Sequence, residues 1–243
     1  MFVGGLASFP VWMILGLCYV DLWAPWAVEV LVKRSTGFPC FVSSSNISLI
    51  KERISLQDIL AVNPGKYEMG DFLRVNRIEV CPSIISLFHG YSGYNSIDID
   101  VQKVSWVLNS IEDTNVQTFL ESLFTPQDQT KAPQKGSEGK GIFIKQLKLT
   151  FNGQIGIRDR SSGLQSKEYP VSYTRSFNNV QYGLTDNQKV ALGLLEDSTP
   201  LENVLDDLVN TFRSGYGFSA LVNTILTSLD KNPRISPFVH RFL

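Results

Sequence analysis

The sequence predicts an α+β protein in which an N-terminal transmembrane helix precedes a bent, mostly antiparallel β-sheet body with an apolar face and C-terminal amphipathic helices. Three observations support this prediction. Residues 2–20 carry no charge and are numerous enough to cross a bilayer as a helix. Most of the remaining chain alternates apolar and polar residues, as strands with one buried face do. Apolar residues at helical spacing return at 115–124 and after residue 198.

The first segment, residues 1–32, is interpreted as a membrane anchor. Trp23 and Trp26 fall where an aromatic belt would meet the membrane–water boundary. A cleaved signal peptide would have a basic start and a shorter apolar core, and this sequence has neither. A signal peptide, a buried core helix and an interfacial helix remain alternatives. Lys33 and Arg34 follow the span, so the positive-inside rule alone would place the body in the cytoplasm.

Composition divides the rest of the chain into two β-rich segments. Residues 125–141 are rich in Pro, Gly, Gln and Lys and are predicted to be a flexible linker between residues 33–124 and 142–243. The 243 residues have a net charge of −1, and both signs are spread along the body. There is no basic tract of the kind that binds nucleic acid, so we expect no nucleic-acid partner.

The first β-rich segment contains four predicted strands. Two short strands lie within residues 41–59 and are joined by a polar turn at 51–53, and two longer strands follow at 72–80 and 97–108. In the last strand the alternation slips by one residue after Lys103. Such a slip predicts a β-bulge that bends the sheet, and two separate strands with a tight bend are the alternative.

The second β-rich segment begins with a strand at 141–151, in which the alternation also slips once. Asn152-Gly153 predicts a hairpin turn because both residues tolerate positive φ, with a return strand at 154–158. A further strand is expected near 169–177.

Two amphipathic helices follow. The first begins at 198–202, with Ser198 or Thr199 as its N-cap and Pro200 in its first turn, and the second covers 218–229. The apolar stripe of the first helix consists of Leu201, Val204, Leu205, Leu208, Val209 and Phe212.

Residues that could carry chemistry form no recognisable constellation. No nucleophile, phosphate-binding or metal-binding motif occurs, so we expect no enzyme activity, cofactor or metal. Asp98 and Asp100 share one strand face and could bind a cation, but a solvated sheet face is the simpler interpretation. Cys40 and Cys81 could pair in an oxidising compartment, although the sequence does not give their separation.

The order of several short motifs resembles a known family. They are Lys33-Arg-Ser-Thr-Gly-Phe38, the turn Val62-Asn-Pro-Gly65, the strand Phe72–Val80, the strand Ile97–Val107 and the helix opening at Asn115. This order resembles the N-terminal region of AsmA-like envelope proteins over roughly residues 1–124. The second half is similar only in style.

The resemblance implies a bacterial inner-membrane protein with a single span and its body in the periplasm, against the orientation suggested by the two basic residues alone. Larger members of the family form elongated, bent sheets with an apolar inner groove. They are thought to carry phospholipid between the two envelope membranes or to help outer-membrane assembly. This chain is too short to bridge the periplasm unaided.

The apolar sheet face is therefore the predicted site, with membrane phospholipid as the expected partner. The candidate lipid-facing residues are Ile97, Ile99, Val101, Val104, Trp106, Ile142, Ile144, Leu147 and Leu149. A closed core between sheet and helices is the alternative reading of the same pattern. A non-catalytic accessory or scaffold subunit of a larger membrane complex is the second functional hypothesis, and an enzyme is the third.

Overall fold

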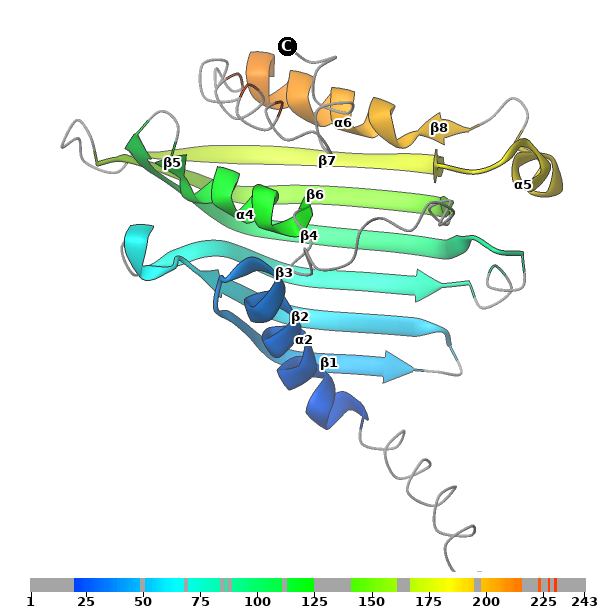
Figure 1. Ribbon diagram of the computed structural model, residues 1–243, viewed down its shortest axis with the longest axis horizontal. Coiled ribbons are helices and arrows are strands. Elements are labelled where there is room, and N and C mark those ends of the chain that lie inside the picture. The colour runs from blue at the N-terminus through cyan, green and yellow to red at the C-terminus, as the bar shows by residue number, and fades with distance from the viewer. Residues whose placement is uncertain are drawn as a thin grey trace, which may run out of the picture.

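The computed structural model describes residues 20–48, 51–67, 70–83, 86, 89–110, 113–124, 141–160, 167–194, 198–215, 223, 227 and 230 (Figure 1). Within these ranges, no helix is both long enough and apolar enough to cross a membrane. Residues 1–19, which hold most of the predicted span, lie outside the described residues, as does the predicted linker except Gly141. Of the helix predicted over 218–229, only residues 223 and 227 are described, and both are helical.

Among the described residues, one mixed sheet of eight strands forms the body, and its strands lie side by side (Figure 1). The strands are β1 (Cys40–Ser48), β2 (Arg53–Val62), β3 (Asp71–Pro82), β4 (Ser92–Ser110), β5 (Asp113–Thr114), β6 (Ile142–Asp159), β7 (Lys167–Tyr182) and β8 (Thr199–Pro200). Their spatial order is β1-β2-β3-β4-β6-β7-β8, and β5 pairs with the end of β4. The β4–β6 and β7–β8 pairs are parallel and the others antiparallel, which confirms the predicted α+β class and mostly antiparallel sheet.

A β-bulge at Gln102 produces the phase slip seen in β4. Val101 pairs with Val75 of β3, and the next pair is Lys103 with Arg74, so Gln102 has no partner in that ladder. The register of β4 against β6 shifts at the same point. The predicted bulge is confirmed, and β4 is one continuous strand.

The predicted hairpin turn at Asn152-Gly153 is wrong. Strand β6 continues through both residues, which pair with Ser172 and Val171 of β7, so the predicted return strand is the second half of β6. The glycine has a different role, because a Cβ on Gly153 would lie 1.6 Å from the carbonyl oxygen of Gln102. Glycine lets the bulged backbone of β4 approach β6 closely.

In the described part of the chain, helices pack against one face of the sheet (Figure 1). Helix α2 (Val20–Thr36) packs against β1, and α4 (Asn115–Phe124) packs near the ends of β2 and β3. Helix α6 (Leu201–Asn210) packs against β6 and β7. The opposite face carries cross-strand ion pairs such as Arg77–Asp98, whose charged atoms are 2.9 Å apart.

Two helix beginnings differ from the prediction. The first C-terminal helix was expected to have a Ser or Thr cap, but Pro200 occupies the N-cap position of α6 and makes no side-chain cap. Thr199 and Pro200 instead pair with Val180 and Gln181 of β7 and form β8. The short helix α5 (Asp186–Ala191) was not predicted, although Thr185 and Gln188 form a capping box at its start.

Candidate functional site

An apolar groove lies on the helix-bearing face of the sheet, between α4 and α6 and above β3, β4 and β6. Its volume is about 370 Å³. All of the described side chains that line it are apolar: Leu73, Val101, Val104, Trp106, Val116, Phe151, Ile155, Leu208, Val209 and Phe212. The groove can therefore exclude water from a hydrocarbon ligand, but among these residues it offers little to orient a polar one.

The bulge in β4 shapes the floor of the groove. Residues three apart in a regular strand point to opposite faces, but the bulge at Gln102 lets both Val101 and Val104 face the groove. Phe151 and Ile155 of β6 continue the floor and belong to one buried cluster. The slip in the sequence pattern thus widens the apolar floor.

Helix α6 forms one wall and is fixed to β7 by a polar contact. The Tyr173 hydroxyl donates a hydrogen bond to Asp207 Oδ2 at 2.9 Å. Burial and the neighbouring Asp207 carboxylate both raise the pKa of Tyr173 above its ordinary value, so the phenol stays protonated. Phe212 lies just beyond α6, in the π-helical segment Thr211–Gly215, and its ring packs beside Phe151 with 6.1 Å between the centroids.

Helix α4 forms the other wall and is fixed by Asn115, which is fully buried. Its Oδ1 accepts from the backbone N–H groups of Val107 and Val116, both at 2.9 Å. Its Nδ2 donates to the Ser105 carbonyl and to Asn63 Oδ1, both at 2.7 Å. Beyond the point where β3 stops pairing with β4, the Asn115 side chain therefore takes the place of a strand partner. It bonds the Val107 N–H and the Ser105 carbonyl, which β3 does not reach.

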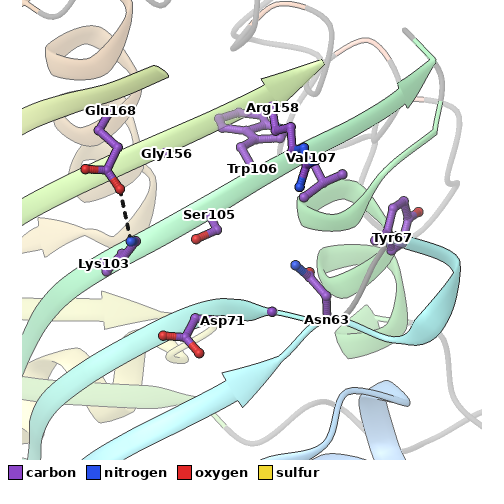
Figure 2. A pocket seen from close by; sticks show the side chains of 11 residues that line it. Asn63, Tyr67, Asp71, Lys103, Ser105, Trp106, Val107, Gly156, Arg158 and Glu168 are labelled. Atoms are coloured by element: carbon purple, nitrogen blue, oxygen red, sulfur yellow. Dashed lines mark hydrogen bonds and ion pairs between the residues drawn. The ribbon is translucent and has the colours of Figure 1, made fainter. Parts of the chain in front are cut away.

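A polar cavity of about 310 Å³ lies near the same end of the sheet (Figure 2). It is lined by Asn63, Tyr67, Gly70, Asp71, Lys103, Ser105, Trp106, Val107, Gly156, Arg158 and Glu168. Among the described residues, Trp106 alone lines both this cavity and the apolar groove. Its indole Nε1 is buried and has no hydrogen-bond partner among the residues that the structure describes.

The charges around the polar cavity are balanced locally. Lys103 Nζ of β4 lies 3.1 Å from Glu168 Oε1 of β7, so this pair reaches across β6 (Figure 2). Lys103 is therefore engaged by the Glu168 carboxylate. Asp71 pairs with Arg74 at 2.9 Å.

A second polar cluster joins the turn after β2 to α4. The buried Tyr67 hydroxyl donates to Asp113 and also lies against Thr118. The hydrogen bond from Tyr67 lowers the pKa of Asp113 below its ordinary value of 3.8, and burial is the main cause that raises the pKa of Tyr67. The cluster ties α4 to the sheet and contains no activated nucleophile.

The other chemistry-bearing residues also have structural roles. Asp98 pairs with Arg77 and lies 4.0 Å from Lys148, while Asp100 accepts from Asn76, so both carboxylates belong to the ion-paired sheet face. Cys40 and Cys81 are free thiols. No group of three metal-ligating side chains gathers within the described part of the chain.

The predicted lipid-facing residues all contribute to the helix-bearing face, but they do not form a single site. Val101, Val104 and Trp106 line the groove. The other six lie along the same face outside its lining, in clusters beneath α2 or α6. Trp106, Ile144 and Leu147 are buried, whereas the remaining six are half-buried.

Sequence reasoning missed seven of the groove residues. Phe151 was placed at the end of a strand and Ile155 in a return strand because of the false turn between them. Leu208 and Phe212 were identified as part of an amphipathic helix, but no local signal showed which strands that helix covers. Val116 belongs to the predicted apolar stripe of α4, but this stripe likewise does not show which strands the helix covers.

Trp23 and Trp26 lie on α2 and are exposed. The structure therefore places them on the surface of the described body, and their contact with a membrane stays a prediction.

No protein-family model, curated protein or solved structure matches this chain.

Proposed function

We propose that the protein is a non-enzymatic, membrane-anchored envelope protein of AsmA-like type that holds phospholipid acyl chains in the apolar groove. In this proposal the segment before α2 spans the inner membrane once and the body lies in the periplasm. The membrane and compartment assignments rest on the uncharged N-terminal run and on the family resemblance. The acyl-chain assignment rests on the groove.

The groove supports this proposal by its size and chemistry. Its volume of about 370 Å³ falls within the range of about 300–1,000 Å³ that is usual for small-molecule sites. Each methylene group moved from water into such a surface contributes roughly 0.8 kcal/mol. Transfer of an acyl chain from water into the groove is therefore strongly favourable even though the lining offers no polar contact.

The apolar surface also continues beyond the groove along β4. Ile97, Ile99 and Val101 are half-buried, which is less than a closed core would give them. They connect the groove to the apolar clusters beneath α2 and α6. An acyl chain longer than the groove could follow this row, and this favours an open site over a sealed core.

The test is native mass spectrometry of the full chain purified in mild detergent, with three variants. We expect the wild type to carry phospholipid. Val104→Glu places a carboxylate in the floor of the groove and should abolish lipid binding, since a charge in the path of an acyl chain is poorly tolerated. Phe212→Glu places a carboxylate in the wall of the groove and should also abolish lipid binding. This variant provides the test if Val104→Glu does not fold. Val190→Glu, at an exposed apolar position on α5, should keep its lipid.

No lipid on the wild type, or equal lipid on all folded variants, would reject the groove as an acyl-chain site. The second candidate function, an accessory subunit of a membrane complex, would then be favoured if a protein co-purifies in place of lipid. The observation behind this candidate is the exposed apolar surface of α2.

A further inference from the structure

The outer face of α2 is apolar over most of its length. Leu22, Trp26 and Leu31 are 76%, 64% and 66% exposed, and Trp23 and Val30 are also exposed. These five residues, which we call the α2 ridge, are a majority of the nine large apolar side chains exposed on the described residues. A concentration of this kind usually marks a contact with a membrane or another protein.

The two acidic residues of α2 are turned away from the ridge. Glu29 Oε1 accepts from the backbone N–H of Val42 at 2.8 Å, and Asp21 Oδ1 accepts from that of Ile47. Both N–H groups belong to β1, the edge strand of the sheet. Helix α2 thus protects this edge with its carboxylates, and its outer face has no charge before Lys33.

The sequence around α2 indicates what covers the ridge. The uncharged residues 2–20 lead directly into α2, so the ridge continues an apolar segment. Tryptophans and terminal basic residues are enriched where helices meet the membrane–water boundary, and Lys33 and Arg34 lie in the last turn of α2. A bilayer matches this combination of apolar length, tryptophan and terminal positive charge.

We propose that α2 lies along the membrane surface with its ridge in the lipid interface, so that edge strand β1 is nearest the membrane and the sheet stands on its edge. This inference rests on the membrane anchoring proposed above and adds an orientation to it. Strand β4 is three strand spacings from β1, so the groove floor would lie on the order of 14 Å beyond the edge strand.

Tryptophan quenching by brominated lipid tests this orientation in the full chain. The chain has four tryptophans, at positions 12, 23, 26 and 106, and all would be replaced by phenylalanine. Single tryptophans would then be introduced as Leu22→Trp, Leu31→Trp and, as a control on α5, Val190→Trp. Each variant would be reconstituted in vesicles of phosphatidylethanolamine and phosphatidylglycerol with bromine on the acyl chains, after its circular dichroism spectrum is matched to the wild type.

Positions 22 and 31 are separated by about 14 Å along the helix axis. If α2 lies along the membrane, both should lose fluorescence to a similar extent, and the residue on α5 should lose little. Nine residues are about two and a half helical turns, so positions 22 and 31 lie on opposite flanks of the ridge. Strong quenching at position 22 with none at 31 would show that α2 stands upright or is rolled onto one flank, and either result would overturn this inference while leaving the anchor intact. Quenching at neither position in vesicle-bound protein would show that the α2 ridge does not enter the lipid interface, and it would overturn this inference. Protein that does not stay with the vesicles would refute the anchoring itself.

Discussion

Gly153 offers a direct test of the bulge that shapes the groove floor. A Cβ added at this position would lie 1.6 Å from the carbonyl oxygen of Gln102 and 2.5 Å from its carbonyl carbon. Real Cβ contacts essentially never fall below 3.0 Å, so β4 and β6 would have to separate by roughly the difference. Both contacting atoms belong to the backbone, so rotation of a side chain cannot relieve the clash.

Gly153→Ala should therefore destabilise the protein by about 1–3 kcal/mol, the usual cost of overpacking. Gly156→Ala is the matched control, three residues along the same strand, where a Cβ would meet only Ser105 Oγ at 3.9 Å. The control should be neutral or more stable by roughly 0.5–1 kcal/mol, because alanine loses less backbone entropy in a strand.

Urea unfolding of the full chain in mild detergent, followed by far-ultraviolet circular dichroism, measures both changes. The account predicts that Gly153→Ala unfolds at a clearly lower urea concentration than Gly156→Ala. Equal midpoints for the two variants would show that β4 and β6 are not in close contact at Gln102.

Three further predictions concern the contacts that hold the helices. Asn115→Ala should destabilise the protein by about 3 kcal/mol or more in the same urea assay, because it leaves several buried polar groups unpaired, and a loss below about 1 kcal/mol would refute the role assigned to it. Because the folded state lowers the pKa of Asp113, the Tyr67–Asp113 bond stabilises the protein above pH 3.8, and this stabilisation is lost as the pH falls through the folded-state pKa. The difference in unfolding free energy between wild type and Tyr67→Phe should therefore shrink on acidification. A difference that does not change with pH would contradict this. Tyr173→Phe should cost roughly 1 kcal/mol by loss of the bond to Asp207, and ultraviolet titration should lose a tyrosine that ionises above the ordinary range; an unchanged titration would refute the bond.

The local features of the fold could be predicted from the sequence. Alternation located the long strands, and the phase slip after Lys103 located the bulge, because a bulge changes the period within one segment. Helix α4 was predicted with the observed limits from its apolar stripe, and the hydroxyl of Thr114, which precedes the helix, accepts from the N–H of Gln117. Each of these features is determined by residues close together in the chain.

Features that depend on distant residues could not be predicted. A glycine after an asparagine is typical of a turn, but at Gly153 the deciding contact is with Gln102, about fifty residues earlier. The parallel pairing of β4 with β6 was also missed, because a crossover separates the two strands. The lining of the groove could not be predicted for the same reason, since the apolar stripe over 201–212 does not reveal that Phe212 lies against Phe151.

The most direct test of the proposed function is photo-crosslinking from the groove in living cells. A photoreactive amino acid would replace Val104 or Phe212 in the full chain, and Lys148 on the ion-paired face would be the control position. The account predicts phospholipid adducts at 104 and 212 and none at 148. Protein adducts without lipid at the two groove positions, or lipid adducts of equal yield at all three, would contradict it.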